Sequence, residues 1–140
     1  MSDPRVERLR RVPLFAGCTD KQLQFIASRA DELDLAKGQV LCREGHSGGD
    51  FFVLLSGTAE VSAAGQVIRT LREGEFFGEI AMLDNGPRSA TVTVSESARA
   101  LVLGPAQFRD ILHQNAEIAT TMLYAVVGRL RAGGSHLPHG

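Results

Sequence analysis

The sequence predicts an α+β fold that is mainly β, with an antiparallel sandwich or small barrel between N-terminal helices and two C-terminal helices. Apolar residues recur at helical spacing only near the two ends of the chain, in residues 1–32 and 104–132. Residues 33–103 contain short apolar or alternating runs instead, separated by glycines about every eight to twelve residues. This spacing indicates hairpin-connected strands rather than βαβ units. Turn glycines are expected at Gly38, Gly45, Gly48, Gly49, Gly57, Gly65 and Gly74.

The composition is that of one soluble domain. The chain has 140 residues, of which 44% are apolar and 22% are charged. A net charge of −1 gives no electrostatic reason to expect nucleic acid or an anionic membrane as a partner. No run reaches the length of a membrane span and the N-terminus lacks the apolar core of a signal peptide, so a cytoplasmic location is expected. In that compartment Cys18 and Cys42 are expected to be buried free thiols.

Local signals define the N-terminal helices. Asp3-Pro4 is a typical helix start, with Asp3 as cap and Pro4 in the first turn. Thr19 and Gln22 have the spacing of a capping box. The helix that this box opens is expected to present one apolar face, formed by Leu23, Ile26, Ala27 and Ala30.

The strands and the C-terminal helices follow from their apolar patterns. Residues 51–55 are continuously apolar, which predicts a strand buried on both faces, whereas residues 59–63 alternate, which predicts a strand with one wet face. Residues 89–94 alternate likewise, and residues 98–103 predict one more strand. Gly104-Pro105 then starts a helix with Phe108, Ile111 and Leu112 inward. The last helix is expected over 116–131, before a disordered tail at 133–140.

The stretch from Phe76 to Val94 carries the candidate site. Gly78 allows close approach to the backbone, and Glu79-Ile80-Ala81 can begin a helical turn whose unpaired amides attract an anion. Arg88 follows within the same stretch, and its guanidinium would clamp a phosphate placed there. Glu79 can accept hydrogen bonds from hydroxyl groups. Together these groups describe a pocket for a sugar phosphate.

Several motifs in the chain resemble those of cyclic nucleotide-binding domains. Residues 77–81, FGEIA, and residues 88–91, RSAT, look like the phosphate-binding cassette of that family, here residues 76–91. The segments KGQVL at 37–41, REG at 43–45 and FFVLLSG at 51–57 are similar to turns and strands of the family's β-roll. The resemblance covers roughly residues 12–131. It implies a jelly-roll-like antiparallel β-roll at 33–103 and a ligand that is cAMP or cGMP.

The resemblance also implies a role for each residue of the cassette. Arg88 is expected to pair with the exocyclic oxygens of the cyclic phosphate, and Glu79 to accept from the ribose 2′-hydroxyl. Ser89 is expected to bond either the phosphate or the edge of the base, which leaves adenine and guanine both open; the habit of bacterial members favours cAMP. The remaining candidates in the cassette are Phe77, Gly78, Ile80, Ala81, Ala90 and Thr91.

Arg129 allows two interpretations. At 100° per residue it falls on the same narrow helical stripe as Ile118, Met122 and Ala125. A charge on an apolar stripe is explained if its side chain reaches water near the C-terminal end of the helix, where the dipole favours it. It is equally explained if Arg129 contacts the purine when this helix closes over the ligand, as an arginine does in some members of the family.

Other classes of function fit the sequence less well. His46, His113, His136 and His139 do not have the spacing of a metal site on adjacent strands, and no serine or cysteine has a catalytic setting. We therefore expect neither a metal nor enzyme activity. We also expect no DNA binding, since the chain leaves no room for a helix-turn-helix after the last helix. Two hypotheses remain: a cyclic nucleotide sensor that moves its C-terminal helix toward an effector domain or partner protein, and a ligand-free β-roll that serves as an interaction module.

Overall fold

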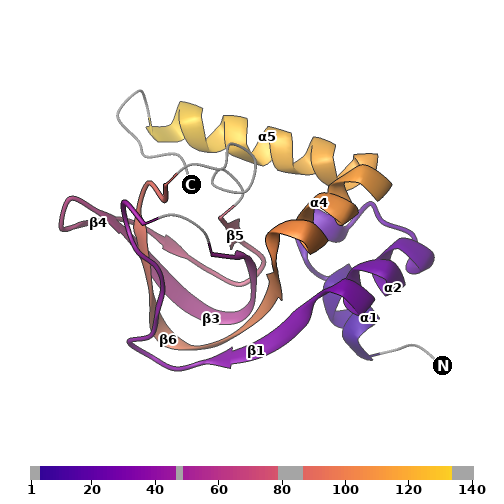
Figure 1. Cartoon of the computed structure of the whole chain (residues 1–140), viewed down its shortest axis with the longest axis horizontal. Coiled ribbons are helices and arrows are strands. Elements are labelled where there is room, and N and C mark those ends of the chain that lie inside the picture. Colours follow the sequence, from indigo (N-terminus) through magenta and orange to yellow (C-terminus); the bar gives the residue numbers. More distant parts are fainter. Residues whose placement is uncertain (1–3, 47–48, 79–86, 134–140) are drawn as a thin grey trace.

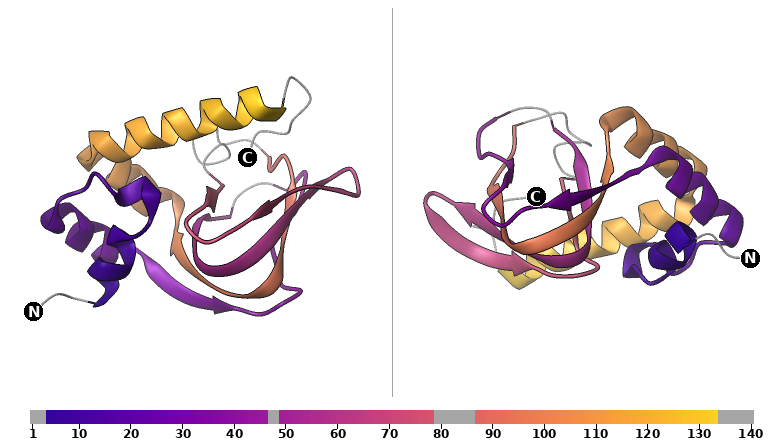
Figure 2. Two further views of the ribbon diagram at one scale, coloured as in Figure 1. Left: turned by 180° about the vertical axis from the view of Figure 1, so that it is seen from behind. Right: turned by 90° about the horizontal axis from the view of Figure 1, so that it is seen from below.

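A computed structural model describes residues 4–46, 49–78 and 87–133, and of residues 125, 126 and 129–133 it describes the backbone alone. The helical elements are α1 (Pro4–Arg10), the 3-10 turn η1 (Pro13–Phe15), α2 (Asp20–Arg29), α4 (Pro105–Gln114) and α5 (Ala116–Gly133). The strands are β1 (Asp31–Leu35), β2 (Val40–Cys42), β3 (Phe51–Ala63), β4 (Gln66–Leu71), β5 (Phe76–Phe77) and β6 (Thr91–Leu103). The strands curl into a roll beside α1, α2 and α4, and α5 extends from this helical group across the roll (Figures 1 and 2).

The strands of the described residues form one antiparallel sheet. Its main path is β1-β6-β3-β4, with β2 paired to β6 and β5 paired to β3. Strands β3 and β6 are 13 residues long each and bend around the roll together. The predicted mainly β fold with flanking helices is therefore confirmed.

The structure corrects the turn expected at Gly57 and the division expected between two strands near the end of the roll. Gly57 is not a turn residue, because β3 continues through it, and the two strands expected around residues 89–103 are one strand, β6. The pairing of β3 with β6 shifts register on both sides of Gly57, which marks a bulge. Gly57 has φ +80°, and a Cβ there would lie 2.5 Å from the Ser97 carbonyl oxygen. Glycine is thus required at a bend in a long strand, where the sequence pattern suggested the end of a short one.

The predicted start of the second helix is confirmed. The Thr19 hydroxyl accepts from the Gln22 N–H at 3.2 Å, and the Gln22 side chain accepts from the Thr19 N–H at 2.8 Å, which completes the capping box. Leu23, Ile26 and Ala27 of α2 are buried as expected, whereas Ala30 follows the helix and is half-buried. The α1 helix begins at Pro4, and Asp3 lies outside the described residues.

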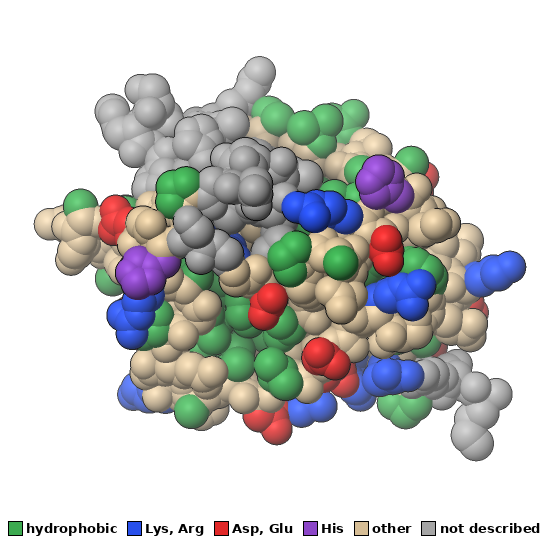
Figure 3. All heavy atoms as spheres, in the orientation of Figure 1, with side chains coloured by type: hydrophobic (Ala, Val, Ile, Leu, Met, Phe, Trp, Pro, Cys, Tyr) green, Lys and Arg blue, Asp and Glu red, His purple; other side chains and the backbone are tan. Residues whose placement is uncertain are grey.

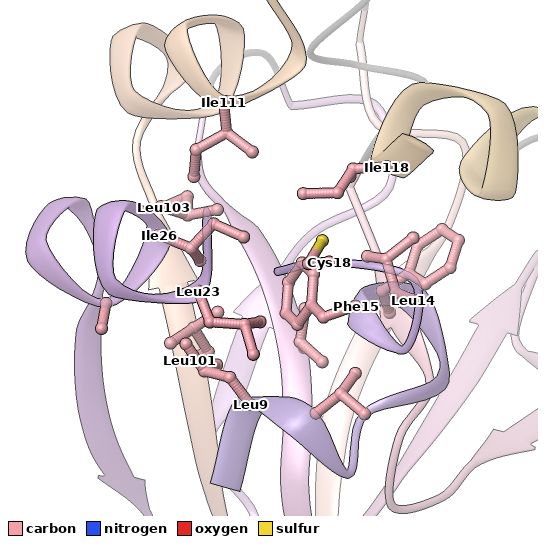
Figure 4. Packing of buried hydrophobic residues seen from close by; sticks show 14 of the residues in the cluster. Leu9, Leu14, Phe15, Cys18, Leu23, Ile26, Leu101, Leu103, Ile111 and Ile118 are labelled. Carbon is pink, nitrogen blue, oxygen red and sulfur yellow. The ribbon is translucent and has the colours of Figure 1, made fainter. Parts of the chain in front are cut away.

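Two apolar clusters share the strands β3 and β6. One cluster fills the space between the helices and the sheet, where side chains of α1, η1, α2, α4 and α5 converge on Leu101 and Leu103 (Figure 4). The other cluster fills the roll and includes Phe52 and Leu54. Because side chains alternate along a strand, Phe51 and Val53 belong to the first cluster and Phe52 and Leu54 to the second. This arrangement confirms that the start of β3 is buried on both faces.

Helices α4 and α5 bring their apolar residues onto the first cluster. Phe108 and Ile111 of α4 are buried, and Leu112 is half-buried. Ile118 and Met122 anchor the first half of α5. Beyond them Leu123, Tyr124 and Val127 are exposed, and apolar side chains are visible along this edge of the molecule (Figure 3). None of the described helices is long and apolar enough to span a membrane.

Charged side chains connect α1 to the sheet. The Arg8 guanidinium donates to both carboxylate oxygens of Glu32 on β1, with Nε at 2.9 Å from Oε1. Arg99 of β6 lies 3.5 Å from the same carboxylate and donates to Asp34 at 2.7 Å. The two arginines lower the pKa of the Glu32 carboxyl, mainly through the hydrogen bonds from Arg8 and against the opposing effect of burial.

Candidate functional site

The backbone of Arg88 is fixed by the turn that follows β2. Arg88 lies just before β6, and its N–H donates to the His46 carbonyl at 2.9 Å. In return the Gly45 N–H donates to the Arg88 carbonyl at 2.8 Å. This reciprocal pair ties two segments that lie more than forty residues apart in the sequence. The position of Arg88 therefore depends on the turn after β2 as well as on β6.

The side chain of Arg88 is buried, with a relative exposure of 4%. Its Nη2 donates to the Asp50 carbonyl at 2.8 Å, at the point where β3 is about to begin. Its Nη1 lies against Gly78, because a Cβ added to that glycine would be only 2.7 Å from Nη1. The structure thus brings Arg88 and Gly78 together. A guanidinium buried to this degree is not the solvated surface arginine that a loop position would otherwise suggest.

Gly78 occupies a position that only glycine fills without strain. Its φ is +99°, and a Cβ there would also come within 2.7 Å of the Asp50 carbonyl oxygen. Phe77 directly precedes it, fully buried in β5, which pairs with β3. The buried strand pair therefore holds the backbone of Gly78 close to the guanidinium.

Some of the other candidate residues lie in the described part of the chain and others lie outside it. Ser89 is half-buried, and Ala90 is buried in the roll. The Thr91 hydroxyl accepts from the Glu44 N–H at 3.0 Å, so it joins β6 to the turn after β2. Glu79, Ile80 and Ala81 lie outside the described residues, as does the side chain of Arg129 on α5. The roles expected for these residues stay predictions.

Two residues that surround Arg88 were not among the predicted site residues. Gly49 has φ +97°, and a Cβ there would lie 2.8 Å from Nη2 of Arg88; the Asp50 carbonyl is the acceptor already described. The local signal was the glycine pair at 48–49, directly before a continuously buried strand. That signal predicts a turn, but it does not reveal which distant side chain the turn receives.

Cys42 lies near the same arginine. Its thiol donates to the Ala90 carbonyl at 3.6 Å, and β2 places it opposite Val92. Burial raises the pKa of the Cys42 thiol, while the positive charge of Arg88 and a hydrogen bond from the Val92 backbone act in the opposite direction. Cys18 is buried and Cys42 half-buried; both are free thiols, as predicted, although Cys42 is less buried than expected. The described residues contain no group of His, Cys, Asp and Glu side chains that could hold a metal ion.

Comparison with known proteins defines the class to which this fold and site belong. A family model for the cyclic nucleotide-binding domain matches residues 32–115, and the chain belongs to that family. It is 33% identical over 106 residues to a cAMP-dependent protein kinase regulatory subunit of Pyricularia oryzae, covering 74% of this chain and 27% of that protein. It is 38% identical over 96 residues to a cGMP-dependent protein kinase of Toxoplasma gondii, covering 69% of this chain and 10% of that protein. The chain therefore spans about a quarter or less of these relatives.

A solved structure gives the same fold. The structure of Sp-2Cl-cAMPS bound to PKAR CBD2 aligns with a TM-score of 0.69 and 28% identity, covering 85% of this chain and 86% of that one. The family's β-roll, expected from the cassette motifs, is thereby confirmed as the architecture of this chain.

Proposed function

We propose that this chain binds a cyclic nucleotide, cAMP or cGMP, and that binding is coupled to a movement of α5. The observation that carries the proposal is the buried guanidinium of Arg88, held by the Asp50 carbonyl against the backbone of Gly78. A buried cation next to a glycine, whose missing Cβ lets a ligand come close to the backbone, is a suitable site for a phosphate. Membership of the cyclic nucleotide-binding domain family supports a cyclised phosphate as the ligand.

The phosphate, the ribose and the base of the ligand each have their own proposed contacts. Arg88 binds the exocyclic oxygens of the phosphate, and the amides of Ile80 and Ala81 complete the anion site. Glu79 accepts from the ribose 2′-hydroxyl. Ser89 bonds the phosphate or the base, and Arg129 contacts the base from α5. Phe77, Gly78, Ala90 and Thr91 shape the wall of the site.

Helix α5 is the element through which binding is proposed to act. Its first half is anchored to the helical core by Ile118 and Met122, and its second half extends across the roll (Figure 2). A ligand that contacts both the cassette and α5 favours the conformation in which the helix lies closer to the roll. It shifts this equilibrium only by the difference between its affinities for the two conformations.

The chain is proposed to be a regulatory domain without catalytic activity. The relatives include a kinase regulatory subunit, and the cGMP-dependent kinase is matched over only 10% of its length. An effector domain or a partner protein would receive the movement of α5, in a cytoplasmic setting. cAMP is the first ligand to test, since both the regulatory subunit and the bound structure are named for cAMP or its analogue.

Calorimetric titration tests the proposal. The native chain is titrated with cAMP and cGMP, with acyclic 5′-AMP as a control for the cyclised phosphate. Arg88→Ala should weaken binding by about 2–5 kcal/mol, roughly thirtyfold to several thousandfold, because a buried charge partner of the phosphate is lost. Arg99→Ala is the matched control, an arginine of β6 that pairs with Asp34 instead. If the folded native chain takes up neither cyclic nucleotide, the proposal is wrong.

A further inference from the structure

We propose that Gly49 is a positioning residue for the nucleotide site, acting on the ligand only through the guanidinium of Arg88. Gly49 and Gly78 form what we call the glycine slot, a pair of residues without Cβ that leave room for the two Nη atoms of Arg88. The inference rests on the proposed function, because it concerns the group that would bind the phosphate. It adds a residue from outside the phosphate-binding cassette to the determinants of affinity.

The two glycines of the slot differ in the atoms that an added Cβ would meet. A Cβ at Gly49 would lie 2.8 Å from Nη2, 3.5 Å from Cζ and 3.6 Å from Nε of Arg88, and these are its three nearest atoms. A Cβ at Gly78 would lie 2.7 Å from Nη1, but also 2.7 Å from the Asp50 carbonyl oxygen and 3.3 Å from Cα of Phe51. A side chain at Gly49 therefore conflicts with the guanidinium, whereas one at Gly78 conflicts with the backbone of β3 as well.

Because of this difference, a change at Gly49 can affect the position of the Arg88 side chain more than it affects the stability of the fold. The atoms that must give way at Gly49 belong to the end of a flexible side chain, so Arg88 can move while the backbone stays in place. Such a movement also disturbs the bond from Nη2 to the Asp50 carbonyl, which has a length of 2.8 Å. A displacement of about 1 Å is enough to misalign a phosphate contact. Gly49→Ala should therefore weaken ligand binding more than it weakens the fold.

The positive φ of Gly49 carries its own cost, and the chain offers a matched control for it. Gly38 has φ +90°, close to the +97° of Gly49, but nothing lies within 4 Å of its added Cβ. Gly38→Ala therefore introduces the same kind of backbone strain without a contact to Arg88. If Gly49→Ala loses more affinity than Gly38→Ala, the difference measures the effect of displacing the Arg88 guanidinium.

The experiment measures affinity, thermal stability and the Arg88 side chain in parallel. Native chain, Gly49→Ala and Gly38→Ala are titrated with cAMP and cGMP, and their Tm values are recorded. We expect Gly49→Ala to weaken binding of the tighter-binding nucleotide roughly tenfold or more, because the energetic effects of residues in contact depend on each other. Gly38→Ala should weaken the same binding by less than about twofold. Gly49→Ala should lower Tm slightly more than Gly38→Ala, because it also disturbs the bond from Arg88 to the Asp50 carbonyl. The NMR resonance of Arg88 Nε, assigned with Arg88→Lys, should shift in Gly49→Ala and stay in place in Gly38→Ala.

The outcomes separate this inference from the proposed function. Failure of the native chain to bind overturns the proposed function, and the Nε resonance then still decides whether Gly49 positions Arg88. If the native chain binds, unchanged affinity in Gly49→Ala overturns the inference, as does an equal loss in both glycine variants. Should Gly49→Ala not fold, Gly49→Asn with Gly38→Asn as its control replaces the pair, because asparagine tolerates a positive φ better than alanine.

Discussion

The rings of Phe52 and Phe77 are stacked, with centroids 4.8 Å apart and planes inclined by 9°. The two residues are direct partners across the pairing of β3 with β5. Phe77 is fully buried and directly precedes Gly78, so the stacked pair fixes the strand from which the backbone of Gly78 continues. The apolar interior of the roll is in this way connected to the candidate site beside Arg88.

Phe77→Ala is expected to destabilise the domain by about 3–5 kcal/mol, because it leaves a cavity in the roll and removes the ring stacking. Chemical denaturation followed by circular dichroism measures this loss. Nucleotide affinity of the remaining folded protein should also fall, since Gly78 loses its support. Phe25→Ala is the comparison: Phe25 is half-buried in α2 and carries the Arg29 guanidinium over its ring. That change should cost about 1–2 kcal/mol and leave affinity intact. A loss below about 1 kcal/mol for Phe77→Ala would contradict the role given to the pair.

Saturating nucleotide is expected to slow amide exchange in α5, within residues 115–131. The response should be largest after Met122, because Ile118 and Met122 already hold the first half of the helix in the core. Hydrogen exchange read by mass spectrometry or NMR measures it. Helix α2, which lies in the helical core, serves as the internal reference and should exchange at the same rate with and without ligand. Unchanged exchange throughout α5 in a protein that binds nucleotide would remove the proposed coupling.

Stability should depend on pH through Glu32. Its pKa is lowered in the folded protein, mainly by the hydrogen bonds from Arg8, so folding gains from this group at pH values above the unfolded pKa of about 4.3. The gain is lost as pH falls through the lower folded value. At pH 7 we expect Glu32→Gln to reduce the free energy of unfolding by about 1 kcal/mol, a modest amount because Arg8 remains partly exposed.

Unfolding titrations between pH 7 and pH 3 check this expectation. The difference between the native chain and Glu32→Gln should shrink toward the acidic end. Asp34→Asn is the matched change, on the same strand and with the same Arg99 partner, but on a side chain that is 85% exposed. It should have little effect at any pH. A Glu32→Gln difference that stays constant with pH would show that the ion pair does not act in this way.

Gly57→Ala is expected to destabilise the domain by about 3 kcal/mol or more, from backbone strain together with overpacking. The added Cβ would lie 2.5 Å from the Ser97 carbonyl oxygen and 2.6 Å from Cα of Ala98, and backbone in a paired strand cannot easily move away. Gly65→Ala has nearly the same φ, +79° against +80°, with nothing within 4 Å, and should cost only about 1–2 kcal/mol. Denaturation midpoints of the two variants give the comparison. Equal losses of stability would mean that backbone strain alone, without overpacking, explains the cost of Gly57→Ala.

The places where sequence patterns succeed and fail follow from the range of the interactions involved. The capping box joins residues three apart, so Thr19 and Gln22 predict it completely. Gly57 also has a strong local signal, but the same glycine suits a turn or a bulge, and the choice depends on Ser97 and Ala98, about forty residues away. The pattern therefore gave a turn where the structure has a continuous strand.

The sequence by itself determined the mainly β fold and the flanking helices, and it assigned Arg88 and Gly78 to one candidate site, because periodicity, caps and motifs are local properties of the chain. Only the tertiary structure decided that the turn after β2 and the start of β3 hold Arg88. The guanidinium bonds the Asp50 carbonyl and lies within reach of Gly49, contacts that span nearly forty residues. Such contacts depend on the register of the sheet and on the bulges that bend it, which no local pattern encodes.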